Sequence, residues 1–192
     1  MGIFGPREPW MIPLFKHKRM LVVLDLDHTL VHTVAHVTEP PALGTSGTFD
    51  IVQSDSSLST VFLRPHISRF IRALTDAGIE YAVWTAGTAT YARDVCAGIA
   101  RFDPTFSPVF VYDRSHTSVV AGRHLKDISS VGSAERVVLV DDDVSHAHFA
   151  KRNSHVVVVP KFHHESTDDS VLLVLAEQVS VFFSLGHTQS GP

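Results

Sequence analysis

The sequence is poor in cysteine, in charge of either sign and in long apolar runs. Cys96 is the single cysteine among 192 residues, which excludes an internal disulfide and fits a reducing compartment. No uninterrupted apolar run reaches about 18 residues, so no transmembrane helix is predicted. Residues 1–15 lack the charged-then-apolar layout of a signal peptide. The net charge of −4 argues against non-specific nucleic-acid binding over the whole surface, so no nucleic-acid partner is expected.

The composition that remains is that of an ordinary soluble globule, with 44% hydrophobic residues and a length suited to one domain. Short β runs alternate with helical stretches, which predicts an α/β fold with a Rossmann-like parallel sheet flanked by helices. Strands are expected over 20–24, 79–84, 136–140 and 156–159, and helices over 65–77, 88–99, 145–150 and 170–183. Two small β-hairpin inserts, over 49–63 and 109–120, take the place of a large cap domain.

The most informative segment follows the first apolar run. Asp25 and Asp27 stand two positions apart, and Thr29 follows two positions later. Two carboxylates at the end of a core strand are costly unless a cation meets them there. The pair therefore predicts a magnesium-assisted phosphoryl transfer, with one aspartate as nucleophile and the other as acid/base.

Further polar residues close other predicted strands. Thr85 follows the strand over 79–84, and Asp141 and Asp142 follow the strand over 136–140. Ligands of open parallel sheets bind outside the carboxyl ends of the strands, so these side chains are expected to meet Asp25 and Asp27 there.

With Lys126 between them, these residues form four motifs in a fixed order that resembles the haloacid dehalogenase superfamily of phosphatases. The segments 62–65, 84–92 and 125–128 narrow the resemblance to the RNA polymerase II C-terminal-domain phosphatases, also called the NLI-interacting-factor-like domain. The similarity extends over roughly residues 20 to 183. It implies an extension over 1–19, a phosphatase domain over 20–185 and a tail over 186–192.

The resemblance also implies roles. Asp25 is expected to form an aspartyl phosphate, and Asp27 to protonate the leaving seryl oxygen and then to activate water. Thr85 would bind a phosphoryl oxygen, and Lys126 would neutralise charge on the phosphate. Arg64 and Thr29 are predicted to contact substrate. The alternatives are a surface arginine that caps a strand end, and a threonine that stabilises its own loop.

The predicted metal is Mg²⁺, because hard oxygen ligands that leave room for water and phosphate suit it. The expected ligands are Asp25, the backbone carbonyl of Asp27, and Asp142. Asp141 is expected to orient Lys126 or to share the site, and Asp143 is either a helix cap or a site residue.

Thirteen histidines invite a second metal interpretation. They include His146-x-His148 and His163-His164, but no cysteine pair accompanies them. The sequence favours surface or core histidines over a zinc site. Cys96 is likewise interpreted as a packing residue of its helix.

A site without a large cap suits an extended peptide, so the predicted substrate is phosphoserine or phosphothreonine in a protein, with the RNA polymerase II C-terminal domain as one candidate. The rival interpretations are another phosphatase of the same branch and a weak or inactive peptide-binding receptor, as in a mitochondrial translocase. A monomer in the nucleus is expected, with the cytoplasm and, for a translocase, the mitochondrion as alternative locations.

Overall fold

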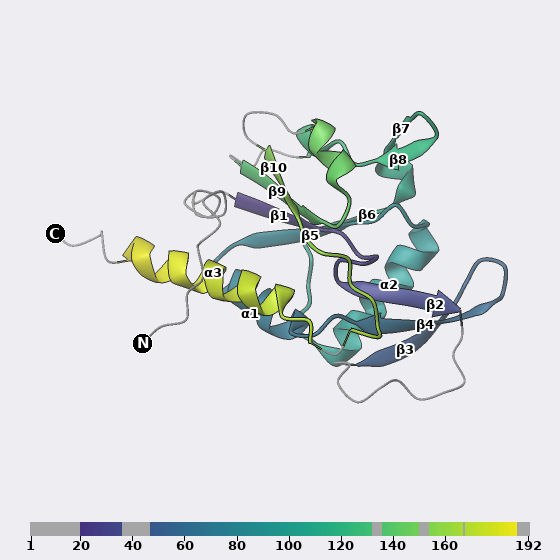
Figure 1. The fold of residues 1–192 in the computed structure, drawn as a ribbon, viewed down its shortest axis with the longest axis horizontal. Helices are drawn as coiled ribbons and strands as arrows, with labels where there is room; N and C mark the ends of the chain where they lie inside the picture. The colour runs from purple at the N-terminus through teal and green to yellow at the C-terminus, as the bar shows by residue number, and fades with distance from the viewer. Residues whose placement is uncertain (1–19, 36–46, 132–135, 150–153, 167, 188–192) are drawn as a thin grey trace.

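The computed structural model describes residues 20–35, 47–131, 136–149, 154–166 and 168–187 (Figure 1). The predicted extension over 1–19, most of the polar loop after residue 35 and the last five residues lie outside this part of the chain. The described residues begin and end close to the predicted limits of the domain, but the boundaries themselves stay a prediction.

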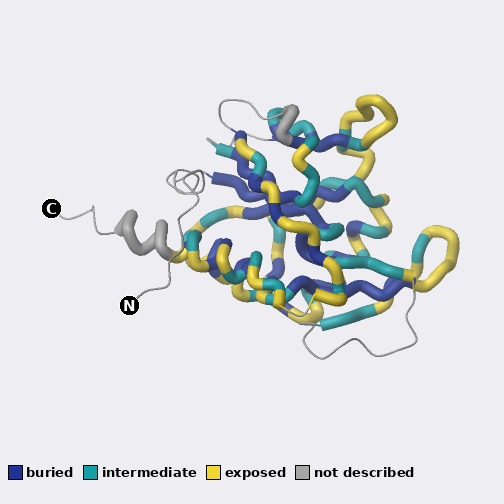
Figure 2. Tube along the Cα trace, in the orientation of Figure 1, coloured by how far each residue is buried: buried dark blue, intermediate teal, exposed yellow. Residues whose placement is uncertain are grey.

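A five-stranded parallel sheet forms the centre, in the order β10-β9-β1-β5-β6 (Figure 1). Its strands are β1 (Met20–Leu24), β5 (Glu80–Trp84), β6 (Val111–Tyr112), β9 (Arg136–Asp141) and β10 (Ser154–Val158). All five residues of β1 are buried, because neighbours lie on both edges and both faces of this strand are covered. Figure 2 shows that burial is concentrated in these central strands. This confirms the Rossmann-like α/β class.

Helices cover the sheet and supply most of its apolar packing. They are α1 (Ile67–Asp76), α2 (Ala89–Phe102) and α3 (Val171–His187), with short 3₁₀ turns η1 (Arg114–His116), η2 (Ile128–Ser130) and η3 (Val144–Phe149). Val22 and Leu24 of β1 belong to the core formed with these α-helices, whereas Leu21 and Val23 face a second core with Ile128. Alternate residues of one strand thus fill two cores. Within the described residues, no helix is both long and apolar enough to cross a bilayer.

An antiparallel three-stranded sheet is inserted between β1 and α1. Its order is β2-β4-β3, with β2 (Val31–Ala35), β3 (Thr48–Val52) and β4 (Leu58–Leu63). The β3–β4 hairpin confirms the predicted insert, whereas β2 was not predicted. No second domain follows, so the expected absence of a large cap agrees with the described parts of the chain.

The predicted hairpin over 109–120 is wrong. Val111–Tyr112 instead forms β6, which extends the parallel sheet beside β5. The actual hairpin pairs β7 (Ser118–Val120) with β8 (Arg123–Leu125). Its two turn residues, Ala121 and Gly122, have φ values of 49° and 77°, as a tight primed turn requires.

The start of α1 also needs correction. The helix begins at Ile67, and Pro65 lies in the turn before it instead of in the first helical turn. His66 precedes the helix with φ of 67°, a left-handed conformation that helical geometry excludes. The predicted core face of this helix, with Phe70, Ile71 and Leu74 buried, is confirmed.

Candidate active site

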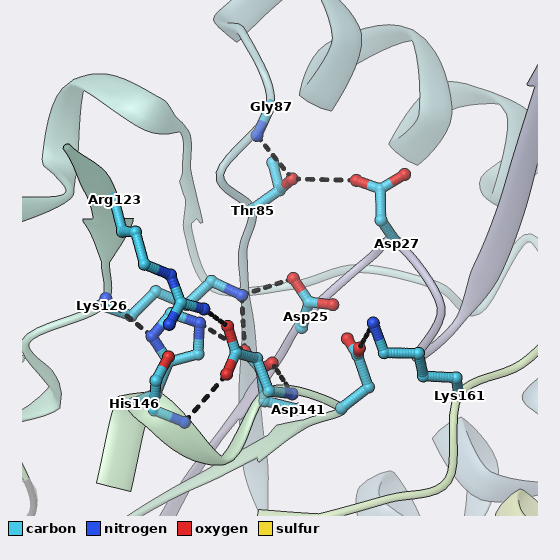
Figure 3. A network of polar contacts seen from close by, with 12 residues as sticks. Asp25, Asp27, Thr85, Gly87, Arg123, Lys126, Asp141, His146 and Lys161 are labelled. Carbon is cyan, nitrogen blue, oxygen red and sulfur yellow. Dashed lines mark hydrogen bonds and ion pairs between the residues drawn. The ribbon is translucent and has the colours of Figure 1, made fainter. Parts of the chain in front are cut away.

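The polar residues that close the central strands meet at one edge of the sheet (Figure 3). Leu24 and Val140 are paired in the parallel register of β1 and β9, so Asp25 and Asp141 follow side by side. β5 is the other neighbour of β1 and ends immediately before Thr85. The residues that follow β1, β5 and β9 therefore lie next to one another, as the sequence predicted.

Lys126 lies between two of the acids. Its Nζ donates to Asp25 Oδ1 and, at 2.7 Å, to Asp141 Oδ2. The lysine is 1% exposed, so this ion pair is withdrawn from solvent. Asp141 uses its second oxygen to accept the backbone N–H of Asp143 at 2.9 Å. Lys126, Asp25 and Asp141 therefore form a buried cluster of ionisable side chains in direct contact.

The pKa values of Asp25 and Lys126 depend on each other. Burial raises the pKa of Asp25, the charge of Asp141 raises it further, and Lys126 opposes both effects. Burial by itself would lower the pKa of Lys126, but Asp25 and Asp141 together raise it. The lysine therefore stays cationic between carboxylates that would otherwise repel each other.

Asp27 lies in different surroundings although it is only two residues away. Its Oδ1 accepts the hydroxyl of Tyr91, and its Oδ2 lies 3.4 Å from the hydroxyl of Thr85. The Tyr91 hydroxyl also shares a 2.7 Å hydrogen bond with Thr33. Burial raises the pKa of Asp27, and the bond from Tyr91 lowers it. Two carboxylates with separate environments can carry separate acid–base roles.

Thr85 connects the Asp27 side to the α2 side of the site. Its Oγ1 accepts the backbone N–H of Gly87 at 2.9 Å and faces Asp27. The residue has no exposed surface, so the phosphate contact predicted for it requires the hydroxyl to leave Asp27.

A cation site is available in the acidic group. Oxygens of Asp25, Asp141 and Asp142 lie within 4.8 Å of one another. The carboxylate of Asp27 is not part of this group, and Asp141 takes its place beside the predicted ligands Asp25 and Asp142. Lys161 Nζ lies 3.4 Å from Asp142 and balances one charge. Three hard oxygen donors in a polar setting fit Mg²⁺.

Asp143 behaves as a cap rather than as part of this group. It accepts the backbone N–H of Ser145 at 2.9 Å and pairs with Arg123 at 2.6 Å.

Arg64 has partners other than the predicted substrate. Its guanidinium is fully buried and makes two 2.9 Å bonds to the carboxylate of Asp169. It also donates to the backbone carbonyls of Thr29 at 3.0 Å and Pro160 at 2.9 Å. The surface strand cap considered for it is therefore wrong, because Arg64 is buried and joins the loop after β1 to the chain after β10, whereas the substrate contact stays a prediction.

Thr29 is fully buried as well. Its hydroxyl has no hydrogen-bond partner within the described residues. A hydroxyl bond that stabilises the loop is therefore not formed, and the substrate contact of Thr29 stays a prediction.

Two neighbours of the site were not predicted. Tyr91 lies within the predicted helix over 88–99 but was given no role in the site, yet its hydroxyl donates to Asp27. His146 Nδ1 accepts the backbone N–H of Lys126 at 3.0 Å, which fixes the chain at the lysine. Cys96, by contrast, is a packing residue, because burial raises the pKa of its thiol to about 12.

Comparison with known sequences supports the geometry. The family described as NLI interacting factor-like phosphatase matches residues 20–184. The Caenorhabditis elegans CTD nuclear envelope phosphatase 1 homolog is 26% identical over 175 residues, which is 86% of this chain and 70% of that protein. The Dictyostelium discoideum CTD small phosphatase-like protein 2 is 30% identical over 139 residues, 70% of this chain and 23% of that protein. The human CTD small phosphatase-like protein is 25% identical, and the chain spans 59% of its length.

Solved structures share the fold. Fission yeast RNA polymerase II CTD phosphatase Fcp1, bound to beryllium fluoride, has a TM-score of 0.53 at 16% identity, over 88% of this chain and 51% of that chain. A putative 3-deoxy-D-manno-octulosonate 8-phosphate phosphatase from Vibrio cholerae has a TM-score of 0.51 at 13% identity, over 100% and 98% of the two chains. At these identities the likeness concerns the fold alone.

Proposed function

Because the chain belongs to the NLI interacting factor-like phosphatases, a branch of the haloacid dehalogenase fold, we propose that it is a Mg²⁺-dependent protein serine/threonine phosphatase. The observation that carries this proposal is the buried lysine shared by Asp25 and Asp141, with Asp27 held apart by Tyr91 and Thr85. A nucleophile, a cation and a separate acid–base group are thereby assembled at one sheet edge.

The reaction proceeds in two displacements at phosphorus. A carboxylate oxygen of Asp25 forms a bond to phosphorus while the bond from phosphorus to the seryl or threonyl oxygen breaks. Asp27 gives its proton to the leaving oxygen, which releases the alcohol. Water then attacks the aspartyl phosphate, and Asp27 takes a proton from it. Inorganic phosphate leaves, and Asp25 and Asp27 return to their initial states.

The surroundings of each acid suit its part. Burial raises the pKa of Asp27 and the bond from Tyr91 lowers it, with a net increase that favours the protonated, proton-donating form more than in a free aspartate. Lys126 stabilises the charge that develops on the phosphoryl oxygens next to Asp25. Thr85 supplies a hydroxyl donor once a phosphate competes with Asp27 for it.

Asp25, Asp141 and Asp142 would hold the metal. A bound Mg²⁺ supplies positive charge that screens the carboxylates from the phosphate dianion. The backbone carbonyl of Asp27 stays a predicted further ligand.

We assign the substrate to the phosphoprotein class because the inserts are small. The insert of β2, β3 and β4 and the β7–β8 hairpin are the additions to the sheet among the described residues, and neither forms a separate domain. An extended phosphopeptide can reach such a site. The names of the relatives make the RNA polymerase II C-terminal domain one candidate and the nucleus the proposed location.

Hydrolysis of para-nitrophenyl phosphate with and without Mg²⁺ tests the chemistry. We expect turnover that requires Mg²⁺, that is abolished in Asp25→Asn and that is inhibited by beryllium fluoride as a phosphate mimic on Asp25. Asp76→Asn, on the exposed end of α1, is the matched control and should retain full turnover. A folded wild-type protein without turnover on this compound or on a phosphopeptide panel would indicate a peptide-binding receptor instead. The same panel identifies the preferred phosphosite.

A further inference from the structure

Imidazole rings gather on the other side of the loop that carries Asp27. The histidine cluster consists of His28, His32, His163 and His164, with Glu165 next to them. Ring centres of His28, His32 and His163 are 5.0, 5.1 and 5.2 Å apart, so these three rings form a nearly equilateral triangle. Two of them belong to the loop and strand after β1, and the third comes from the chain after β10, which passes β2 in Figure 1. Residues more than 130 positions apart are thus brought together.

The backbone builds this arrangement. His28 adopts φ of 60°, and its N–H donates to Val31 at 2.7 Å. The N–H of Phe162 donates to the carbonyl of His28 at 2.7 Å, and His28 Nδ1 lies 3.0 Å from the carbonyl of Phe162. Arg64 joins the same two segments through Thr29 and Pro160. The rings therefore stand on a scaffold that is fixed by other contacts.

The hydrogen bonds leave ligand atoms available. A carbonyl accepts only, so His28 Nδ1 carries its proton toward Phe162 and the lone pair lies on Nε2. His163 is exposed, and its ring is accessible to an ion from solvent. Ligand atoms of His28, His32 and His163 lie within 4.8 Å of one another. Three convergent imidazoles with an accessible face are the protein ligand set of an open zinc site.

We propose that His28, His32 and His163 form a second cation site, which takes a borderline-soft transition-metal ion such as Zn²⁺. Nitrogen ligands of a tetrahedral zinc are about 3.3 Å apart, and the centres of their rings are about 5 Å apart. The ring centres already have this spacing, so turning the rings brings the nitrogens together. A water molecule completes the fourth position.

His32 requires one rearrangement. In this structure its Nδ1 accepts the backbone N–H of His164 at 3.0 Å and lies 2.9 Å from His164 Nδ1. An ion therefore binds His32 through Nε2, so the proton of that ring moves to Nδ1. Nδ1 then gives up the backbone N–H of His164 and donates to His164 Nδ1 instead, which must turn from Glu165 to accept it. A ligand histidine oriented by a second polar group is a common feature of metal sites.

The two cation sites differ in chemistry. Three carboxylates present hard oxygen donors at the ends of β1 and β9, whereas the histidine cluster presents nitrogen donors. Mg²⁺ favours the first and Zn²⁺ the second, so both ions can bind at once. An ion on the histidines would fasten residue 163 to the loop of Asp27.

Direct binding tests the proposal independently of catalysis. The full chain is freed of metal and titrated with Zn²⁺ in excess Mg²⁺ by calorimetry, and a Co²⁺ titration is followed by visible absorption. We expect one equivalent of either ion and the intense absorption bands of tetrahedral Co²⁺. His163→Ala, at an exposed position, should fold as the wild type and weaken binding at least 10-fold, as should His28→Gln. His155→Ala, an exposed histidine of β10, is the matched control and should bind normally.

Asp142→Asn separates the two sites. Zn²⁺ binding that persists in this variant and falls in His163→Ala supports the proposal. Binding that is lost in Asp142→Asn and unchanged in His163→Ala would place the ion among the carboxylates and overturn it, as would the lack of stoichiometric binding in the wild type. None of these readouts needs phosphatase turnover, so the two proposals stand or fall separately.

Discussion

Ionisable side chains are crowded on both sides of the Asp27 loop, as carboxylates around Lys126 on one side and as the histidine cluster on the other, and the two groups differ in how they are stabilised. On the sheet side, Asp25 and Asp141 both pair with the buried side chain of Lys126. On the other side, burial and neighbouring rings lower the pKa of His32 to about 4, so this histidine is neutral at pH 7. The first arrangement depends on an internal counter-ion, and the second is open to an external one. Loss of a partner should therefore be severe on the first side and mild on the second.

Lys126→Met should give the largest effect, because it leaves Asp25 and Asp141 buried without their cation. We expect a loss of roughly 3–5 kcal/mol in the free energy of unfolding and a fall in turnover of at least about 100-fold. Urea denaturation and para-nitrophenyl phosphate kinetics measure the two. Lys161→Met removes an exposed partner of Asp142 and should cost less than about 1 kcal/mol. Equal stability of the two variants would refute the buried-pair account.

Arg64→Met tests whether Arg64 has a structural role in joining the loop after β1 to the chain after β10. The change leaves Asp169 and two backbone carbonyls without their donor, so we expect a loss of roughly 3 kcal/mol in unfolding free energy. Asp169→Asn combined with Arg64→Met should cost less than the sum of the single changes. Unchanged stability with a raised KM for a phosphopeptide would support the substrate contact predicted from the sequence.

Tyr91→Phe sharpens the contrast between Asp25 and Asp27. The bond from Tyr91 lowers the pKa of Asp27, so its loss should move the limb of the pH–rate profile that reports Asp27 to higher pH. We also expect turnover to fall about 10-fold and stability to fall by about 1 kcal/mol. Thr33→Val removes the other partner of the Tyr91 hydroxyl and should leave that limb in place. A limb that stays put in Tyr91→Phe would exclude this role for the tyrosine.

His32→Asn should give the smallest effect, confined to the pH dependence of stability. The folded pKa of about 4 lies below the ordinary value of 6.5, so the unfolded chain binds the proton more readily between these values. This contribution to stability is complete above pH 6.5 and is lost as the pH falls toward 4. The variant should therefore lose less stability over this interval than the wild type, in chelator and by urea denaturation. An unchanged slope would mean that His32 is not a buried neutral base.

The sheet side of the site could be predicted because the sequence itself shows where each apolar strand ends and which polar residue follows it. An apolar run that ends in an acid places that acid at the carboxyl edge, and parallel neighbours share the edge. Asp25, Asp141 and Thr85 were found in this way, and the same runs predicted every strand of the main sheet except β6. The position of Lys126 came from motif order alone, because nothing in its local sequence indicates burial.

The other side depends on contacts that local patterns do not contain. β2 is short and half-buried, with two polar residues, so its apolar alternation is weak. His163 and His164 acquire partners only because the chain after β10 returns to the loop of Asp27. Arg64 was predicted to contact substrate, with a surface strand cap as the alternative, since a sequence does not show that Asp169 lies opposite to it. The β-branched run over 109–120 was misread because its first part pairs with β5, which is distant in sequence.

Two hydrogen bonds between His28 and Phe162, one between backbone groups and one from the His28 ring, set a lower limit on the length of a working fragment. Every acid proposed for catalysis occurs before residue 143, yet the loop of Asp27 is held from the far side by a segment some twenty residues later. Shortened versions or chimeras made by fusing another C-terminal half after Asp143 would keep all the acids proposed for catalysis and metal binding, but would lose the contacts that hold the Asp27 loop. The smallest exchangeable unit therefore extends through Asp169, where Arg64 finds its carboxylate.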